Sequence, residues 1–173
     1  MNMKLRLKNK NSGFTLVELM VVIAVIGILA GIAIPNFFSF LPKSRLRSAA
    51  RDIVSCLQEM KLRAIKENAT TVIVFDLAND RYTAFVDNGP GAAAGNSALD
   101  ASESIIKQET LASDLDMYNT SFVANTGGFT ARGLPRNAGT VFIRYSNTDY
   151  RRVIVNLAGN IRIEMSTDGV NWN

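Results

Sequence analysis

The chain has 173 residues, and its 19 lysines and arginines against 15 aspartates and glutamates give a formal charge of +4. This length suits one domain with an appendage. The sequence has no histidine and a single cysteine. These absences exclude a Ser-His triad, a Cys-His dyad, an internal disulfide framework and a cysteine-based zinc site. We therefore expect no catalytic residues, no metal and no other cofactor.

The chain begins with a basic segment that is followed by a long apolar run. Residues 1–13 contain four basic side chains and no acid, namely Lys4, Arg6, Lys8 and Lys10. Phe14 to Ile34 spans 21 residues with Glu18 as its only charge. As a helix this span is about 32 Å long, enough to cross the hydrocarbon core of a membrane. The basic flank predicts a cytoplasmic N-terminal side, with the rest of the chain outside.

A cleaved secretory signal and a plain signal anchor are the simplest alternatives for this segment. Residues 30–33 (AGIA) match a signal-peptidase site only loosely, and the apolar run is longer than usual. Glu18 is unexpected in either case, because a carboxylate in a membrane helix costs about 2–3 kcal/mol. Its neighbours in the sequence are apolar. We therefore expect its partner on another molecule, or as a new charge made by processing.

The run GFTLVELMVVIA from Gly13 to Ala24, with Pro35 at the far end of the apolar span, resembles the type IV pilin and pseudopilin superfamily. The resemblance implies that a prepilin peptidase in the bacterial inner membrane removes residues 1–13 by cleavage between Gly13 and Phe14. The same enzyme would N-methylate Phe14. The resemblance also implies that Glu18 pairs with the N-terminal amine of a neighbouring subunit in a filament, where a buried charge needs such a partner.

Apolar residues continue at helical spacing after the membrane segment 14–35. The stripe consists of Leu46, Ala49, Ala50, Ile53, Val54, Leu57, Met60, Ala64 and Ile65. It predicts an amphipathic continuation of the helix over 36–68, laid on a sheet. Pro35 and Pro42 are predicted to kink or loosen the helix. We expect Cys56 to be a small buried residue, and the basic cluster 43–51 to be a solvated face rather than a lipid contact.

Residues 69–173 predict a β-rich globular head. The expected strands are 71–75, 81–87, 105–111, 121–124, 140–145, 151–156 and 160–165. Residues 88–104 read as an exposed, mobile loop, 114–120 as a polar connection, and 166–173 as an extra hairpin tip. One long helix followed by strands predicts an α+β, pilin-like fold with the helix packed on antiparallel sheet.

A second motif narrows the resemblance. Residues 129–135 (FTARGLP), Gly139 and the strand pair around Gly159 resemble the H-type minor pseudopilins of type II secretion and the FimT-like minor pilins, together the GspH/FimT family. We expect Phe129 to anchor this loop, and Gly133 and Gly139 to permit tight turns.

This narrower resemblance implies a structural subunit rather than an enzyme. The subunit would help to start assembly near the tip of a type II secretion pseudopilus or a type IV pilus. The implied partners are other pilin or pseudopilin subunits, the prepilin peptidase and the inner-membrane assembly platform, with secreted cargo as an option. Before assembly the chain would cross the inner membrane once, with its head in the periplasm.

Six arginines stand in the last third of the chain: Arg132, Arg136, Arg144, Arg151, Arg152 and Arg162. The FimT-like pilins of some competent bacteria grip DNA through a basic C-terminal region, so DNA uptake is the alternative function. We favour pairing with the acidic face of the same or a neighbouring subunit, because strand alternation lets only some of these side chains share a face. The acids between 76 and 116 match no calcium loop and predict a solvated acidic face.

Processing would change the meaning of the net charge. The four basic residues of the leader account for the whole +4, so the processed chain has 15 basic and 15 acidic side chains. What remains is a basic, then acidic, then basic distribution along the chain. This distribution suits head-to-tail contacts between neighbouring subunits better than general affinity for polyanions.

Overall fold

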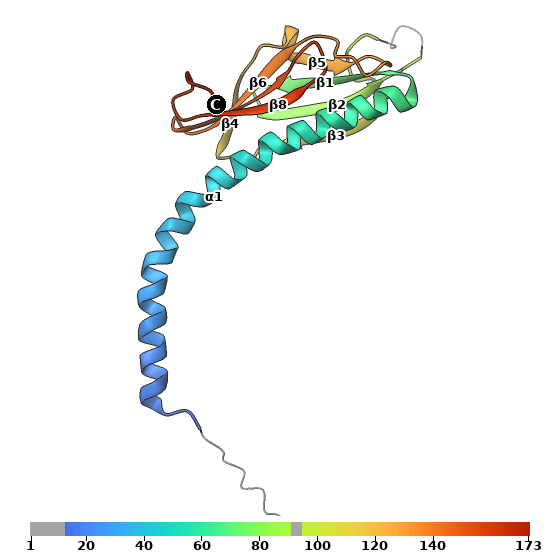
Figure 1. Cartoon of the computed structure of the whole chain (residues 1–173). Coiled ribbons are helices and arrows are strands. Elements are labelled where there is room, and N and C mark those ends of the chain that lie inside the picture. The colour runs from blue at the N-terminus through green and yellow to red at the C-terminus, as the bar shows by residue number, and fades with distance from the viewer. Residues whose placement is uncertain (1–12, 91–94) are drawn as a thin grey trace, which may run out of the picture. The chain divides into compact units, whose positions relative to one another are not determined.

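The computed structural model describes residues 13–90 and 95–173. In these residues one long helix, α1 (Leu16–Glu67), precedes all the strands (Figure 1). The strands are β1 (Thr70–Asp76), β2 (Arg81–Asp87), β3 (Ser104–Thr110), β4 (Leu115–Thr120), β5 (Thr126–Phe129), β6 (Gly139–Tyr145), β7 (Asp149–Val155) and β8 (Ile161–Ser166). The expected α+β fold is confirmed.

The chain divides into two compact units, Met1–Phe40 and Leu41–Asn173. In the first unit, Leu16–Ile34 is a helical stretch long and apolar enough to cross a membrane, with a mean hydropathy of 2.8. The helix continues without interruption through Pro35 and Pro42, so neither proline ends it. A kink at either proline stays a prediction.

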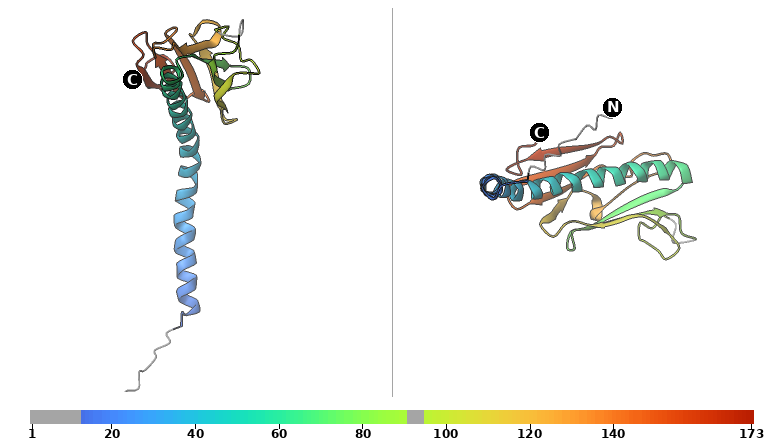
Figure 2. Two further views of the ribbon diagram at one scale, coloured as in Figure 1. Left: turned by 90° about the vertical axis from the view of Figure 1, so that its right-hand side faces the viewer. Right: turned by 90° about the horizontal axis from the view of Figure 1, so that it is seen from below.

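The second unit contains two antiparallel sheets and the later part of α1. The first sheet has the strand order β3-β2-β1-β5, and the second has the order β4-β6-β7-β8. Figure 2 shows that the helix after residue 41 runs lengthwise along both sheets. The core cluster joins side chains from the helix and from both sheets, so the helix closes one common core.

The helical stripe predicted from the sequence forms the helix side of this core. Leu46, Ile53, Leu57 and Met60 are at most 1% exposed. Ile65 was expected in the stripe but is exposed, because it lies about 100° around the helix from the fully buried Ala64, at the edge of the stripe. The end is a Schellman-type cap: Asn68 is left-handed (φ 48°), and the Ala69 amide donates to the Ala64 carbonyl at 3.1 Å.

Two sequence expectations between residues 114 and 124 were wrong. Residues 114–120 were expected to be a polar connection, but most of this segment is β4, in which Leu115 and Met117 alternate into the core. Residues 121–124 were expected to be a strand, but Val123–Asn125 is a 3₁₀ turn in which Ala124 is left-handed (φ 50°). The strand that follows, β5, was not expected, because its sequence TGGF has low strand propensity.

Phe122 connects the two sheets. Its ring is buried and stacks on Phe75 with 5.5 Å between the ring centroids. It lies against Gly127 of β5 and Gly139 of β6; an added Cβ would press on the ring at Gly127 and collide with it at Gly139. Gly139 therefore makes room for a ring inside a strand and does not form the tight turn that we expected.

The other residues of the second motif match their expected roles. Phe129 is fully buried, and its backbone forms an isolated bridge with Pro135. Gly133 is left-handed (φ 73°), and a Cβ there would press on the side chain of Ile65.

The last residues also fold back, because the backbones of Met165 and Asn173 exchange hydrogen bonds of 2.9 and 3.0 Å.

Candidate functional site

The helix start carries the first candidate site. Gly13 to Thr15 is non-helical, and α1 begins at Leu16. Thr15 caps the helix, because its hydroxyl accepts a 3.2 Å hydrogen bond from the backbone amide of Glu18. Phe14 is 80% exposed, and nothing lies within 4 Å of where a Cβ of Gly13 would be. The predicted cleavage bond therefore lies on open, non-helical backbone.

Glu18 occupies the third helical position, where the first-turn amides and the helix dipole favour a negative charge. Within residues 13–90 and 95–173, no hydrogen bond or ion pair reaches its carboxylate. Sequence reasoning missed the local role of the Thr15-Leu-Val-Glu18 spacing. This spacing is that of a capping box, and it could have marked the helix start.

Three of the six arginines lie on the outer face of the second sheet, each beside an acid. Arg144 Nε is 2.7 Å from an oxygen of Asp116. Arg152 Nε is 2.8 Å from Glu164, and Arg162 Nε is 3.0 Å from the other oxygen of the same carboxylate. These guanidinium groups are therefore paired with acids of the same sheet. The expected pairing with the acids between residues 76 and 116 is seen for Arg144, whereas Arg152 and Arg162 share Glu164, which lies outside that region.

Aromatic rings interleave with these arginines. The guanidinium of Arg144 lies 4.9 Å from the centroid of the Tyr118 ring, and that of Arg152 lies 4.4 Å from the centroid of the Trp172 ring. Both distances suit cation–π contacts. Phe142 contacts both rings, with centroid distances of 5.9 Å to Tyr118 and 5.7 Å to Trp172. Burial raises the pKa of Tyr118.

The other three arginines lie elsewhere on the head. Arg132 and Arg136 belong to the loop after β5, and Arg136 donates to the hydroxyl of Ser97 at 2.8 Å. Arg151 lies in β7 next to Arg152, so its side chain points to the opposite face of the sheet. The structure therefore does not bring the six arginines onto one surface.

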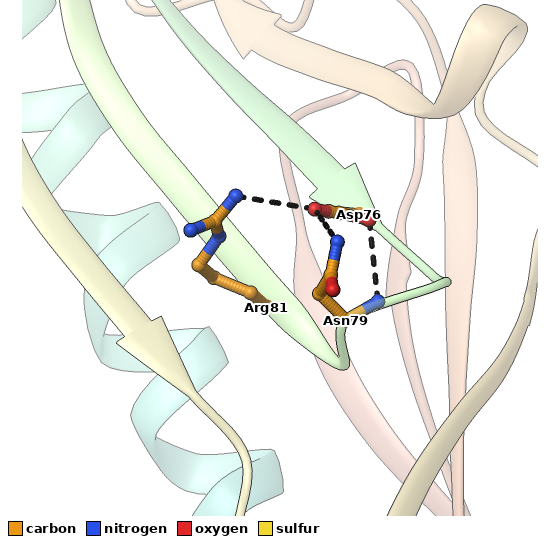
Figure 3. A network of polar contacts seen from close by, with 3 residues as sticks. All are labelled: Asp76, Asn79 and Arg81. Atoms are coloured by element: carbon orange, nitrogen blue, oxygen red, sulfur yellow. Dashed lines mark hydrogen bonds and ion pairs between the residues drawn. The ribbon is translucent and has the colours of Figure 1, made fainter.

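Several acids between residues 76 and 116 accept hydrogen bonds that stabilise turns and loops. At the β1–β2 turn, Asp76 accepts hydrogen bonds from the side chain of Asn79 at 2.8 Å and from Arg81 at 3.2 Å (Figure 3). The pKa of Asp76 lies below its ordinary value, and the largest cause is the hydrogen bond from the Asn79 side chain. Asp80 accepts from the Met117 amide at 2.7 Å, so it ties this turn to β4.

Two further acids organise the described part of the 88–104 loop. Asp87 is buried and accepts from the amides of Gly95 and Ser97 at 2.6 and 3.1 Å. Glu103 accepts from the amides of Gly89 and Asp100. The solvated acidic face that we expected is therefore wrong for Asp87 and Glu103. In the described residues no group of three or more acids, cysteines or histidines could hold a metal ion.

Cys56 is buried in the core at 1% exposure, as expected from its place beside the stripe. Burial raises the pKa of its thiol to about 12. The hydroxyl of the buried Tyr82 has no hydrogen-bond partner among the described residues, and burial raises its pKa as well. A thiol in such surroundings is a packing group and not a nucleophile.

Family models match both parts of the chain. Residues 8–34 match the prokaryotic N-terminal methylation motif. Residues 49–159 match the model described as type II transport protein GspH.

Several curated proteins are similar in sequence. A type IV major alpha-pilin of Moraxella bovis is 32% identical over 127 residues, covering 58% of this chain and 80% of that protein. Type II secretion system core protein G of Aeromonas hydrophila is 39% identical over 75 residues, and the major pilin PilA of Myxococcus xanthus is 52% identical over 48 residues. These two matches cover 43% and 28% of this chain, and only 44% and 22% of those proteins.

Two kinds of solved structure share the fold. The minor pseudopilin EpsH of the Vibrio cholerae type 2 secretion system has a TM-score of 0.54 at 17% identity, covering 69% of this chain and 95% of that chain. The type IV minor pilin FimU of Pseudomonas aeruginosa has a TM-score of 0.56 at 18% identity, covering 78% of this chain and 96% of that chain.

Proposed function

The chain belongs to the type II transport protein GspH family, and we propose that it is a filament subunit processed at Gly13 and assembled through its apolar helix. The observation that carries this proposal is the helix start. An exposed Gly13–Phe14 bond directly precedes the cap of a helix that is apolar enough to cross a membrane.

The geometry of the helix start supports the proposed processing step. A peptidase needs its target bond in accessible backbone, and Gly13 to Thr15 are exposed and non-helical ahead of the first helical turn. Cleavage after Gly13 leaves Phe14 as the new N-terminus, with Thr15 still in place to cap the helix. The match of residues 8–34 to a methylation motif supports N-methylation of the Phe14 amine by a prepilin peptidase.

Glu18 would then direct assembly. Its carboxylate has no partner among the described residues, yet it belongs to a stretch that is suited to lipid or to a filament core. A buried unpaired carboxylate is costly, whereas one that faces a cation is compensated. The amine of Phe14 on a neighbouring subunit is a cation that processing would create.

The filament would be a type II secretion pseudopilus or a type IV pilus, with this chain as a minor subunit that helps to start assembly near the tip. Its partners would be other pilin or pseudopilin subunits, the prepilin peptidase and the inner-membrane assembly platform. The likeness of relatives from both systems supports both choices. Before assembly the head would lie in the periplasm, where it could also meet secreted cargo.

DNA uptake has weaker support as a function. A phosphate grip requires several free guanidinium groups on one surface. Here Arg144, Arg152 and Arg162 pair with acids on the outer face of their sheet, while Arg151 points to the opposite face. These positions favour contacts within the head over a polyanion site.

The processing proposal is tested by measuring the mass and N-terminal sequence of the full chain from cells with and without a prepilin peptidase. We expect a chain of residues 14–173 that carries one methyl group on Phe14, formed only with the peptidase. Gly13→Leu is expected to leave the leader attached. An N-terminus at Met1 or near Ala33 in cells with the peptidase would contradict the proposal.

The assembly proposal is tested with Glu18→Ala and its matched control Glu18→Asp. Both variants should be cleaved and inserted like the wild type. Glu18→Ala should be lost from sheared filaments, while Glu18→Asp, which keeps the charge, should be partly retained. Equal recovery of Glu18→Ala and wild type in the filaments would show that assembly does not require the Glu18 carboxylate.

A further inference from the structure

The outer edge of the second sheet has unused backbone groups. Strand β8 is the last strand in the order β4-β6-β7-β8, so one of its edges has no neighbouring strand. Met165 uses its amide and carbonyl on that edge to pair with Asn173. Because every second residue of a strand directs its amide and carbonyl to the same edge, Ile161 and Ile163 present theirs there too.

The side of β8 that faces α1 is partly apolar and partly uncovered. Val153 of β7 is fully buried, but its cross-strand neighbour Ile163 is 38% exposed and Met165 is 54% exposed. Ile163, Met165 and Asn173 line a groove of about 300 Å³ between the strand and the helix. A strand added to β8 would cover this apolar surface.

Arginines form the other wall of the groove. Arg47 and Arg51 from α1 line it together with Arg151 from β7. Neither Arg47 nor Arg51 has a side-chain hydrogen bond or ion pair with any residue in the described ranges. Arg151 donates to the carbonyl of Tyr150 at 2.8 Å.

The acids near this wall are already engaged. The Asp149 carboxylate pairs with Lys43 at 3.4 Å, and Glu164 pairs with Arg152 and Arg162. Burial lowers the pKa of Arg151, and the nearby charge of Arg47 lowers it further, against the opposing effect of Asp149. Glu164 also lines the groove, but its carboxylate already pairs with Arg152 and Arg162, so the groove holds more positive than negative charge.

We propose that β8 is a docking edge for an extended segment of another protein that carries carboxylates on one side. The segment would add a strand beside Ile161 and Ile163, and its acidic side chains would face Arg47, Arg51 and Arg151. This inference goes beyond the proposed function, because it requires neither processing at Gly13 nor a particular filament.

The backbone edge distinguishes this partner from a nucleic acid. A phosphate backbone could bind the arginines. It could not supply the alternating hydrogen-bond donors and acceptors that the carbonyl and amide groups of Ile161 and Ile163 require. An extended peptide satisfies both the edge and the charge. The experiment therefore tests the edge and the charge separately.

The probe is a short fluorescein-labelled peptide that alternates threonine and glutamate, titrated into the full chain in non-ionic detergent and followed by fluorescence anisotropy. We expect this peptide to bind. We expect at least about tenfold weaker binding for the same peptide with lysine in place of glutamate, and for one with N-methylated backbone amides on alternate residues. A short DNA duplex serves as the competing polyanion.

Variants locate the site. Arg47→Gln with Arg51→Gln should weaken binding of the glutamate peptide about tenfold, and Arg47→Glu with Arg51→Glu should bind the lysine peptide instead. Ile163→Pro removes one edge amide without removing a bond to β7, and Ile163→Val is its matched control. The charge-reversal pair remains informative if the proline variant does not fold.

Two kinds of outcome would overturn the proposal. One is equal binding of the glutamate, lysine and N-methylated peptides, which would show that binding depends neither on charge nor on backbone hydrogen bonds to the edge of β8. The other is binding of the DNA duplex through Arg47 and Arg51 in the absence of peptide binding.

Discussion

The two units of the chain use the same apolar residue types in opposite ways. In the first unit Leu29 is 60% exposed and Ile23 is also 60% exposed, whereas in the second Leu57 and Ile53 are at most 1% exposed. A continuous apolar surface of this extent marks a membrane or protein contact. The head completes its own core, while the large apolar side chains of the first unit stay exposed.

The charges show the same contrast. Asp87 and Glu103 in the head each accept two backbone amides, so folding alone satisfies them. Glu18 has no such partner in the part of the chain that the structure describes. The comparison teaches that folding alone satisfies the head, whereas the first unit keeps apolar side chains and one carboxylate for the contacts that we propose it makes on assembly.

A matched pair of leucine truncations should give the sharpest contrast. Leu57→Ala leaves a cavity in the core and should lower the free energy of unfolding of the head by about 2–5 kcal/mol. Leu29→Ala should change it by less than about 0.5 kcal/mol. Urea denaturation of the full chain in detergent, followed by Trp172 fluorescence, measures both. A similar loss in both variants would contradict the division into two units.

A pair of glycine substitutions extends the contrast to the backbone. In Gly128→Ala the new Cβ would collide with the backbone carbonyl of Thr71 on the neighbouring strand, which should cost about 1–3 kcal/mol. Nothing lies within 4 Å of a Cβ at Gly27, so Gly27→Ala should leave the head unchanged and favour the helix slightly. Thermal unfolding by circular dichroism distinguishes the two; equal melting temperatures would refute the packing argument.

Alkaline pH should weaken the head through Cys56. Burial raises the pKa of this thiol from its ordinary value of 9.0 to about 12, so the unfolded chain releases the proton first. The free energy of unfolding should therefore fall as the pH rises from about 9 toward about 12, with no contribution from Cys56 below that window. Urea titrations at neutral pH and about pH 10 measure the fall. Cys56→Ala should reduce it, and an unchanged fall would exclude the thiol as a cause.

The smallest effect is expected on the outer face of the second sheet. Arg152→Ala removes a contact with Glu164 and one with Trp172, and should cost about 1 kcal/mol. Arg162→Ala should cost close to nothing, because its side chain is 66% exposed. A double-mutant cycle with Glu164→Gln measures each pair. A larger loss for Arg162→Ala would reverse the assignment.

Much of the fold could be predicted because periodicity and turn chemistry agree with burial. The stripe from Leu46 to Ala64, the hairpin around residues 77–80 and the strand at 140–145 all combine apolar spacing with clear boundaries. Strand β4 was missed because only Leu115 and Met117 point inward, and the residues between and after them are polar or aromatic. Strand β5 was missed because its glycines serve the Phe122 ring and the close approach to β1, which no local propensity reports.

The candidate site was predictable to a different degree at each end of the chain. The run around Gly13 and Glu18 is contiguous, so the sequence alone gives its spacing. The pairing of Arg144 with Asp116, or of Arg152 with Glu164, depends on strand register between distant segments. The groove at β8 depends further on which sheet edge is left open, and this is decided only by tertiary structure.

The position of Phe122 has a mechanical consequence. One ring is wedged between a glycine of each sheet, while α1 packs on both sheets from the same side. Movement of one sheet past the other would require this ring to shift, so we expect the two sheets to bear a load together. The head should therefore respond to an applied force as one stiff body, with Phe122 as the side chain that links its two sheets.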